Sequence, residues 1–268
     1  MSKKPLRHKE ILTLLSEQPT LRISEIAATL NVTRETIRRD FQELTELRLV
    51  DRLYGGALLR QGPETNVDQR NDLLVEERKL IARLARDLLG DAQTIMLGSG
   101  ATTVHVARQI ANECQDLTVI VHSLGVIPAL ETNPSLTIVM APGVFHPGER
   151  AVHGVQTVEF LQQYSADWCI LGASGIGAEG ASDALLEGSD VYRCMIRRSE
   201  KCMILADGSK FNRRFPSRYA DWSQVTALVS DRMPERDLAG SIRAPGAKIV
   251  VPQHPNSAAM PGNCGAQT

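Results

Sequence analysis

Long apolar runs are missing from this sequence: none approaches the roughly 18 residues that a membrane-spanning helix requires. The first ten residues, MSKKPLRHKE, lack the apolar segment of a secretory signal. Cys-x-x-Cys pairs are missing too, and the odd number of cysteines argues against a disulfide framework. The five are Cys114, Cys169, Cys194, Cys202 and Cys264. We therefore expect a cytoplasmic protein whose thiols are reduced and mostly buried.

Metal-ligand spacing is also absent among the histidines of the central part of the chain. His105, His122, His146 and His153 do not form a pattern such as His-x-x-x-His. We expect no metal site and no cofactor. His122 follows a predicted strand, and for this residue a role in ligand choice and an ordinary packing role both remain open.

The length and the charge distribution suggest two domains. One hydrophobic core typically takes about 100 to 200 residues, and the chain has 268. Hydrophobic residues make up 43% and charged residues 23%, as is typical of a folded protein. The net charge of -1 divides unevenly: residues 1–60 carry 11 Lys and Arg against 8 Asp and Glu (+3), and the other 208 carry 19 against 23 (-4). The positive first segment is the one suited to meeting phosphate groups.

Three short helices are predicted in the first 47 residues. Near-helical spacing of apolar residues predicts the first over 6–17. Ser24 is placed to cap the second, which ends before a tight turn at Asn31. Thr33 is placed to cap the third, which is predicted over 34–47.

The third helix has one apolar and one polar face. Ile37, Phe41, Leu44 and Leu47 fall at i, i+4, i+7 and i+10, which predicts a buried stripe. On a helix in the DNA major groove, arginine bonds guanine, glutamate accepts from cytosine and threonine contacts the thymine methyl group. The predicted DNA-reading residues are Thr33, Arg34, Glu35, Thr36, Arg38 and Arg39. A charged helix face can equally be a solvated surface, and the pattern alone leaves both interpretations open.

A glycine-centred hairpin follows the third helix. The two apolar runs of LVDRLYGGALL (49–59) meet at a glycine pair, which predicts a β-hairpin, or wing. Arg52 and Tyr54 in this wing are predicted to hold DNA phosphates. The polar segment 61–73 has no periodicity and is typical of a linker.

The stretch 23–59 resembles the winged helix-turn-helix of DeoR-type bacterial regulators. Their signature is V-T/S-x-x-T-I-R-R-D-L followed by a G-G-A wing. The matching residues are Thr33, Thr36, Ile37, Arg38, Arg39, Asp40, Gly55, Gly56 and Ala57. Phe41 stands where Leu is usual, and Tyr54 stands where His commonly precedes the glycine pair. The resemblance implies a DNA-binding regulator of transcription.

A different pattern begins at residue 75. A helix is predicted over 75–89, and after it short β-branched or apolar runs alternate with helical segments. The predicted strands are 93–97, 117–121, 136–140, 168–171, 202–206 and 225–229. This alternation predicts an α/β domain with a largely parallel sheet.

Loops rich in glycine and hydroxyl residues follow these strands. GSGATT (98–103) opens a helix, where backbone N–H groups favour an anion such as phosphate. Lys210 lies in a similar loop, and a cation there is suited to a phosphate dianion. Ligands of open α/β sheets bind at the edge where such loops gather. A plain strand-to-helix turn and a solvated lysine explain the same residues, so the loops alone do not decide.

These loops resemble the effector domain of the DeoR family, so that the likeness covers nearly the whole chain. The landmarks are the loop 99–103, Ser123-Leu124, Gly143, the run 171–176, a helix bearing Glu187 and Arg193, and Asp-x-Ser-Lys-Phe at 207–211. That domain resembles ribose-5-phosphate isomerase, and the family's effectors are typically phosphorylated sugars or polyol phosphates. The effector-binding residues so implied are Gly98, Ser99, Gly100, Thr102, Thr103, Ser123, Gly143, Ser174, Gly175, Glu187 and Lys210.

Catalytic groups of the isomerase are depleted here. Such an enzyme needs acidic and basic groups placed to move a proton between adjacent carbons. Ser174 stands at the position of the isomerase's loop aspartate, and Gly177 stands at its next acidic position. Glu187 could still act as a base, but 178–186 contains no lysine where the resemblance requires one. We predict no catalytic residue.

The predicted architecture is an α/β effector domain resembling ribose-5-phosphate isomerase, preceded by a small winged helix-turn-helix domain. The predicted boundaries are 1–60 for DNA binding, 61–74 for the linker, 75–252 for effector binding and oligomerisation, and 253–268 for a disordered tail.

The predicted function is repression of a carbohydrate or polyol catabolic operon, relieved by a phosphorylated sugar or polyol. Predicted partners are double-stranded operator DNA, the effector and further copies of the chain in a dimer or tetramer. The predicted location is the bacterial cytoplasm, on the nucleoid when operator is bound. Two alternatives remain: a sugar-phosphate isomerase-like enzyme with an accessory DNA-binding module, and a constitutive DNA-binding protein with a vestigial sensor.

Overall fold

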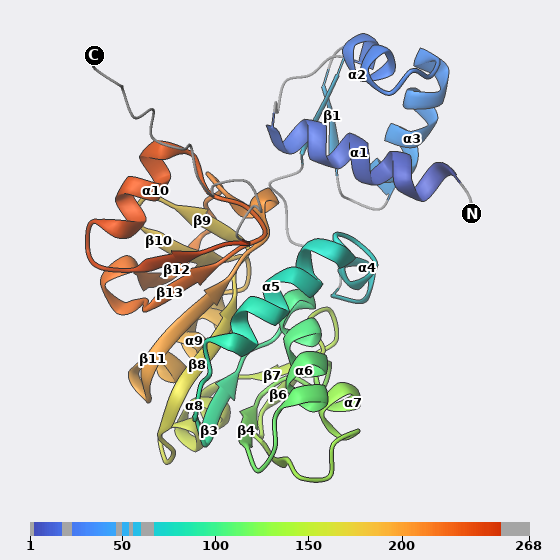
Figure 1. The fold of residues 1–268 in the computed structure, drawn as a ribbon. Coiled ribbons are helices and arrows are strands. Elements are labelled where there is room, and N and C mark those ends of the chain that lie inside the picture. The colour runs from blue at the N-terminus through green and yellow to red at the C-terminus, as the bar shows by residue number, and fades with distance from the viewer. Residues whose placement is uncertain (1–2, 18–22, 47–49, 54–55, 60–66, 253–268) are drawn as a thin grey trace, which may run out of the picture.

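The computed structural model describes residues 3–17, 23–46, 50–53, 56–59 and 67–252. A small N-terminal unit lies beside a larger α/β unit (Figure 1). Within the described residues, no helix combines the length and the apolar character that crossing a membrane requires.

The N-terminal unit contains three helices and a hairpin. Its elements are α1 (Lys3–Glu17), α2 (Ile23–Thr29), α3 (Arg34–Glu46), β1 (Val50–Leu53) and β2 (Gly56–Leu59). β1 and β2 are antiparallel, as the glycine pair predicted for the wing. The core is formed by Ile11, Leu15, Ile26, Ala27, Ile37, Phe41, Leu44 and Val50.

The sequence-based predictions for this unit are largely confirmed. Ile37, Phe41 and Leu44 form the buried stripe of α3, each at most 2% exposed. Leu47, the fourth residue of the predicted stripe, lies outside the described residues. α2 begins at Ile23, so Ser24 lies inside its first turn and not at the predicted cap position.

The segment predicted to be an aperiodic linker contains a short helix, α4 (Val67–Asn71). Val67 is 2% exposed, and its N–H donates to the Gly148 carbonyl over 2.8 Å. Five residues are too few to show helical periodicity. α4 is therefore secured by docking on the α/β unit, which its own sequence does not reveal.

The α/β unit is built on seven parallel strands in the order β14-β13-β11-β8-β3-β4-β5. These are β3 (Thr94–Leu97), β4 (Thr118–Val121), β5 (Thr137–Met140), β8 (Ala166–Gly172), β11 (Ser199–Leu205), β13 (Ala227–Val229) and β14 (Lys248–Val250). Six of them were predicted, and the parallel arrangement is confirmed. β14 was missed.

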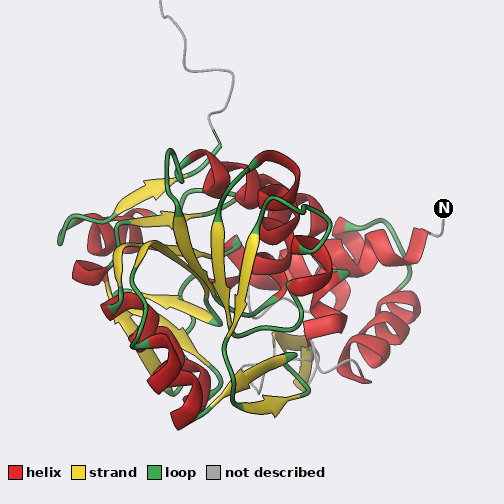
Figure 2. Cartoon of the chain, turned by 90° about the horizontal axis from the view of Figure 1, so that it is seen from below, coloured by secondary structure: helices red, strands yellow, loops and turns green. Residues whose placement is uncertain are grey.

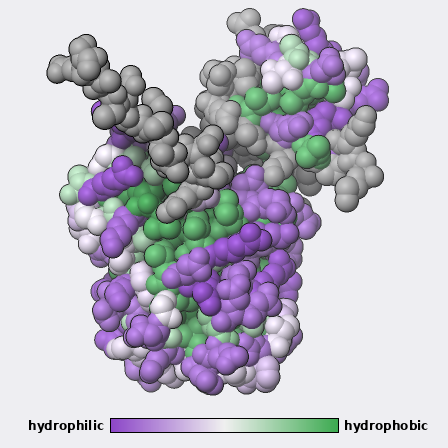
Figure 3. Space-filling view, viewed as in Figure 1, coloured by the Kyte–Doolittle hydropathy of each residue, from purple (hydrophilic) through white to green (hydrophobic). Residues whose placement is uncertain are grey.

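Helices cover both faces of this sheet (Figure 2). One face packs against α5 (Val75–Asp87), α6 (Ala101–Glu113) and α7 (Ile127–Leu130). The other packs against α8 (Val155–Leu161), α9 (Leu186–Arg197) and α10 (Arg236–Arg243). The outer surface of α5 is mostly hydrophilic, and an apolar area lies between α5 and α10 (Figure 3).

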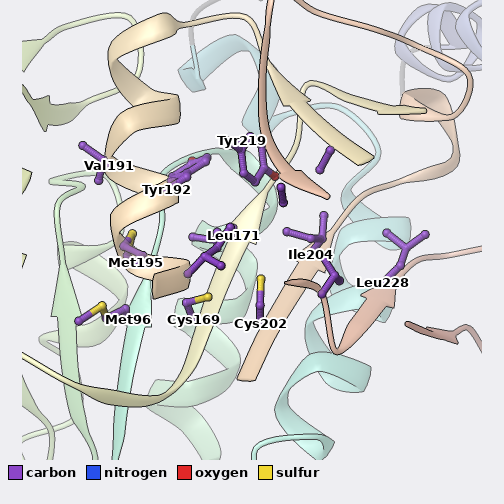
Figure 4. Close-up of a cluster of buried hydrophobic side chains, with 14 of the residues drawn as sticks. Met96, Cys169, Leu171, Val191, Tyr192, Met195, Cys202, Ile204, Tyr219 and Leu228 are labelled. Carbon is purple, nitrogen blue, oxygen red and sulfur yellow. The ribbon is translucent and has the colours of Figure 1, made fainter. Parts of the chain in front are cut away.

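Alternation along the strands divides the apolar residues between two cores. On β3, Ile95 and Leu97 face the α5–α6 side, whereas Met96 faces α9. Figure 4 shows the α9 side, where Cys169 and Cys202 lie on neighbouring strands beneath Tyr192. The described cysteines are thiols, as predicted: Cys169, Cys194 and Cys202 are buried and Cys114 is half-buried. Cys264 lies outside the described residues.

Two small antiparallel sheets, absent from the sequence-based prediction, complete the unit. One contains β6 (Val144–His146) and β7 (Ala151–His153); the other contains β9 (Gly175–Gly177), β10 (Gly180–Asp183) and β12 (Ser217–Asp221). Two 3-10 turns are η1 (Gly208–Lys210) and η2 (Trp222–Gln224).

The strand order brings three predicted loops together. β11, β8 and β3 are neighbours, so the loops that follow them begin at one edge of the sheet. These loops contain Lys210, Ser174 and Ser99 respectively.

Candidate nucleic-acid interface and ligand pocket

The outward face of α3 carries the predicted DNA-reading side chains into solvent. The Arg38 and Arg39 side chains are 68% and 77% exposed. Both lie near the Glu35 carboxylate, with N···O distances of 4.0 Å from Arg38 and 3.5 Å from Arg39. Arg34 is also exposed. Such hydrated, weakly held cations are available to an incoming polyanion.

Thr33 fixes the start of α3. Its Oγ1 accepts from the Thr36 N–H over 3.1 Å and is 2.8 Å from the Thr36 Oγ1. This is the predicted N-cap, and it orients the first turn. The predicted DNA-reading residues therefore begin at a defined point on the helix.

Asp40 anchors α3 to α1 from beneath. It is 1% exposed, and its carboxylate accepts from the Arg7 Nε over 2.6 Å and the Arg7 Nη2 over 2.9 Å. His8 Nε2 is 3.1 Å from the same carboxylate. Burial opposes ionisation, but the hydrogen bonds and charge of Arg7, with those of His8, outweigh it and lower the pKa of Asp40. The aspartate of the signature motif thus has a structural role that the sequence had not assigned.

The wing is only partly described. Arg52 lies in β1 opposite Ala57, but its side chain is outside the description. Tyr54 lies outside the described residues. Their predicted phosphate contacts remain predictions.

A cavity opens at the edge of the sheet where the loops after β3, β8 and β11 meet. Its volume is about 380 Å³, the open mouth included. It is lined by Arg70, Arg78, Ser99, Gly100, Ala101, Thr102, Glu149, Gly172, Ala173, Ser174, Asp183, Tyr192 and Lys210. We call this cavity the effector pocket, because residues predicted to bind the effector line it; effector binding there is a prediction. Five predicted effector residues line it: Ser99, Gly100, Thr102, Ser174 and Lys210.

The N-terminus of α6 forms one wall of the effector pocket. Gly100 precedes the helix with a φ of 120°, a conformation that residues with a Cβ rarely adopt. Below it, the Tyr192 hydroxyl donates to the Ser99 carbonyl over 3.0 Å. Burial raises the pKa of Tyr192 well above its ordinary value, so the hydroxyl stays neutral. The loop is thereby held with the N-terminal peptide groups of α6 beside the cavity.

A buried charge cluster adjoins the effector pocket at Arg78 and Lys210, which line it. Arg78 Nη2 lies 3.8 Å from Asp207 Oδ2, and both side chains are at most 5% exposed. Burial opposes ionisation of Asp207, but the charges of Arg78 and Lys210, with hydrogen bonds from Ser209, lower its pKa. Asp207 also caps η1 by accepting from the Ser209 N–H over 3.1 Å. Lys210 is therefore presented from a turn whose start is fixed.

Four charged residues of the effector pocket were missed by the sequence-based prediction: Arg70, Arg78, Glu149 and Asp183. Arg70 comes from α4 and bonds to Glu149, 79 residues away. Glu149 belongs to the loop 142–150, which follows a predicted strand, but nothing in that loop singled it out. Nothing in the local sequence singled out Arg70 or Arg78: docking of α4 brings Arg70 to the effector pocket, and Arg78 is presented by the buried side of α5.

Six predicted effector residues do not line the effector pocket, and three of them are glycines. A Cβ on Gly143 would lie 2.1 Å from Thr157 Oγ1 and 2.7 Å from the His153 carbonyl oxygen. A Cβ on Gly175 would lie 2.5 Å from the Arg213 carbonyl oxygen. Gly98 packs against Tyr192. Close packing thus explains these glycines without a ligand.

The other three are polar residues with contacts elsewhere. Thr103 is fully buried and donates to the Gly100 carbonyl over 2.7 Å. Ser123 is buried, and its Oγ accepts from the Gly125 N–H over 3.1 Å. Glu187 is exposed on the first turn of α9. Ligand contacts by these residues remain predictions.

Ser174 supports the backbone of the effector pocket. It is 2% exposed, and its Oγ accepts from the Ala184 N–H over 3.2 Å. A hydroxyl engaged in this way holds a turn and is poorly suited to proton transfer. The nearby Asp183 carboxylate accepts from the Leu185 N–H over 2.7 Å.

A row of histidines packs behind the effector pocket. The ring centroids of His122 and His153 are 5.4 Å apart, and those of His153 and His146 are 6.1 Å apart. Burial, and then the charge of His153, lowers the pKa of His122 to about 3; burial, and then His146, lowers that of His153 to about 4. His122 is fully buried, with Nδ1 2.9 Å from the Val152 carbonyl oxygen. These contacts favour the packing role for His122.

The described part of the chain contains no cluster of three or more His, Cys, Asp or Glu side chains able to hold a metal ion.

Comparisons with known proteins agree with this arrangement. The family model of the DeoR-like helix-turn-helix domain matches residues 7–61, and that of the DeoR C terminal sensor domain matches residues 74–232. The two matches together span both units of the structure.

Full-length relatives give the same picture. The HTH-type transcriptional repressor CsqR of Escherichia coli is 29% identical over 249 residues, 92% of this chain and 95% of its own. The glycerol-3-phosphate regulon repressor of Haemophilus influenzae is 31% identical over 252 residues, 93% of this chain and 97% of its own.

Solved structures show more distant similarity. A D-ribose-5-phosphate isomerase in complex with phospho-erythronic acid is 18% identical with a TM-score of 0.39, over 51% of this chain and 54% of its own. The tetrameric eIF2B-beta2-delta2 complex of C. thermophilum is 10% identical with a TM-score of 0.48, over 89% and 72%. These likenesses are too remote to bear on function.

Proposed function

This chain belongs to the DeoR family, and from that membership we propose that it represses a carbohydrate or polyol catabolic operon and leaves its operator when a phosphorylated sugar or polyol binds. The chain is a DNA-binding regulator of transcription. Relatives named as repressors, including that of the glycerol-3-phosphate regulon, support the kind of operon proposed.

The composition of the effector pocket is the observation that carries the effector class. Three cationic side chains, those of Arg70, Arg78 and Lys210, line it together with the N-terminal residues of α6. Cations and helix N-terminal amides are the groups that bind phosphate in proteins. The Asp183 carboxylate and the Thr102 hydroxyl supply partners for sugar or polyol hydroxyls.

Two walls of the effector pocket adjoin the DNA-binding domain. α4 follows the wing in the chain, and η1 lies beside α1 (Figure 1). An effector releases DNA only if its affinities for the DNA-bound and released states differ. Displacement of α4 or η1 on effector binding supplies such a difference.

Oligomerisation belongs to the proposal. A single winged helix reads a half-site of a few base pairs, so a dimer or tetramer is needed for a full operator. Sedimentation velocity of the purified chain, with and without operator DNA, measures the number of copies. A monomer on a single half-site contradicts this part of the proposal.

The isomerase-like alternative is not favoured. Ser174 holds a backbone turn where the isomerase resemblance requires an aspartate, and the relatives carry the names of repressors. The chain is a regulator and not an enzyme. Isotope exchange at C2 of ribose 5-phosphate by the purified protein would contradict this conclusion.

Thermal unfolding with a panel of phosphorylated sugars and polyols tests the effector class. The panel comprises glycerol 3-phosphate, fructose 6-phosphate, glucosamine 6-phosphate and ribose 5-phosphate, each beside its unphosphorylated parent. A ligand that binds the folded state alone raises the melting temperature, by about 5 to 11 °C at a hundredfold excess over Kd. The phosphorylated effector should raise it and its parent should not.

Release of operator DNA, selected beforehand from a randomised pool, completes the test. The effector found in the panel should dissociate the wild-type complex. Lys210→Ala should lose this release, whereas Lys248→Ala, an exposed lysine outside the effector pocket, should retain it. A panel with no shift at all would favour the constitutive DNA-binding alternative. A normal response by Lys210→Ala would move the phosphate site elsewhere.

A further inference from the structure

The linker helix α4 is docked on the effector domain at both of its ends. At its start, the Val67 N–H donates to the Gly148 carbonyl in the turn between β6 and β7. At its end, the Arg78 guanidinium donates to the carbonyls of Arg70 and Leu73. Because α4 follows the wing, a displacement of α4 also displaces the chain that leads to it from the wing.

One side chain of α4 forms part of the effector pocket. Arg70 lines it, and its Nη2 donates to Oε2 of Glu149, which lines it too. The two side chains are only 12% and 15% exposed. Glu149 belongs to the same turn whose Gly148 holds Val67. One contact between the turn and α4 is therefore made by two side chains that line the effector pocket.

A phosphate entering the effector pocket competes with Glu149 for Arg70. The planar guanidinium matches two phosphate oxygens at once. A phosphate monoester carries about 1.5 to 2 negative charges at pH 7, more than one carboxylate. Glu149 and the phosphate also repel each other, because the effector pocket holds both in partly desolvated surroundings. The Arg78 guanidinium is less available, since it already meets two carbonyls and Asp207.

We propose that Arg70 binds the effector's phosphate in exchange for Glu149, and that this exchange loosens the β6–β7 turn from α4. The inference rests on the proposed function, since it needs an anionic effector in the effector pocket. It places a ligand-recognising side chain on the segment that joins the two domains. Occupancy of the effector pocket is thereby converted into a change in the position of α4.

Calorimetric titration of the full-length chain with inorganic phosphate and with glycerol 3-phosphate tests the exchange. Arg70→Gln removes the charge and the two parallel N–H donors of the guanidinium, and we expect at least about tenfold weaker binding of both probes. Glu149→Gln removes the competing carboxylate, and we expect about fivefold tighter binding. Arg83→Gln, on the exposed side of α5 and outside the effector pocket, is the matched control, with affinity within about twofold of wild type.

The double variant distinguishes exchange from simple repulsion. If Glu149 acts by occupying Arg70, the tighter binding caused by Glu149→Gln shrinks, when Arg70 is already glutamine, to the part that comes from direct repulsion of the phosphate. A gain that persists in full overturns the exchange. Amide hydrogen exchange provides a second measurement: saturating glycerol 3-phosphate should speed exchange in α4 of the wild-type chain. Unchanged exchange there overturns the loosening.

The outcomes separate this inference from the proposed function. If wild type and Arg83→Gln bind neither these probes nor any member of the panel, the proposed function fails. If wild type binds and needs Lys210, but Arg70→Gln binds equally well, only the role of Arg70 fails. Should Arg70→Gln not fold, Arg70→Lys takes its place. About fivefold weaker binding then supports the exchange, and unchanged binding overturns it.

Discussion

Arg38 and Arg39 on α3 leave 68% and 77% of their side chains exposed, whereas Arg78 in the effector pocket leaves 5%. The α3 arginines lie near the equally exposed Glu35. Arg78 meets Asp207 and two carbonyls. The same side-chain type is thus hydrated and adaptable in one domain, and desolvated and fixed in the other.

This difference matches two kinds of anion. A long polyanion attracts hydrated surface arginines from a distance, and its binding weakens with salt because counterions compete. A small dianion needs groups that are already in place and shielded from water, and salt screens such contacts less. We therefore expect DNA binding to be sensitive to salt and effector binding in the effector pocket to be less so.

The largest expected effect comes from breaking the scaffold of the effector domain without touching α3. Gly143→Ala would place a Cβ 2.7 Å from the His153 carbonyl oxygen and 2.1 Å from Thr157 Oγ1, at a φ of 156°. We expect a loss of at least about 4 kcal/mol in the free energy of unfolding of this domain. Urea unfolding followed by tryptophan fluorescence measures it, since Trp168 and Trp222 are buried there.

Gly240→Ala is the matched control for this prediction. Gly240 lies inside α10, and a Cβ there meets nothing within 4 Å. Alanine at such a position should stabilise the helix by about 0.5 to 1 kcal/mol. If Gly143→Ala folds normally but loses the effector response, the glycine acts by ligand contact, as the family resemblance implied, and the packing explanation is wrong.

The second prediction breaks the support of the DNA-reading face and leaves the effector pocket untouched. Asp40→Asn leaves Arg7 and His8 without their buried carboxylate. We expect a loss of about 2 to 3 kcal/mol in the local stability of α1 and α3. This loss is smaller than that for a fully buried ion pair, because Arg7 is partly exposed. Amide hydrogen exchange of the full-length chain measures it, helix by helix.

The pH dependence of the second prediction follows from the lowered pKa of Asp40. Its ionised form stabilises the domain above the ordinary pKa of about 4, and this contribution is lost as the pH falls through the lower folded-state value. The difference in stability between wild type and Asp40→Asn should therefore shrink in acid.

Lys4→Ala is the control for the anchoring role. It breaks the exposed pair with Glu43 between the same helices and should lower their local stability by less than about 1 kcal/mol. Equal losses in both variants would contradict the anchoring role.

Features that arise from local spacing were predictable from the sequence. The α3 stripe, the cap at Thr33 and six strands of the main sheet each depend on residues that lie within one helix or one strand. The position of Asp40 on the apolar face of α3 also follows from the sequence, since it lies between Ile37 and Phe41. Its role does not, because its partner Arg7 lies 33 residues away.

Features made by distant segments were not predictable. Arg70 and Glu149 are 79 residues apart and meet because α4 docks on the β6–β7 turn. Gly143 shows the opposite difficulty: a glycine in a motif fits both close packing and ligand contact. The two explanations are distinguished only by the structure, in which a Cβ added at Gly143 would collide with Thr157.

The smallest expected effect sharpens the comparison between the two arginine environments. Arg38→Ala should weaken operator binding by about 1 to 2 kcal/mol and leave effector affinity within about twofold. If Arg38 holds a phosphate, the slope of log affinity against log salt should also fall by about one per bound chain; if it reads a base, discrimination at one operator position is lost instead. Fluorescence anisotropy with labelled operator at salt concentrations from about 50 to 200 mM measures both, with Arg83→Ala as the exposed control.

In wild type, operator affinity should fall at least about tenfold over that range and effector affinity less than about threefold. Equal salt dependence would mean that burial of the pocket arginines does not shield them, and the contrast between the two domains would lose its physical basis.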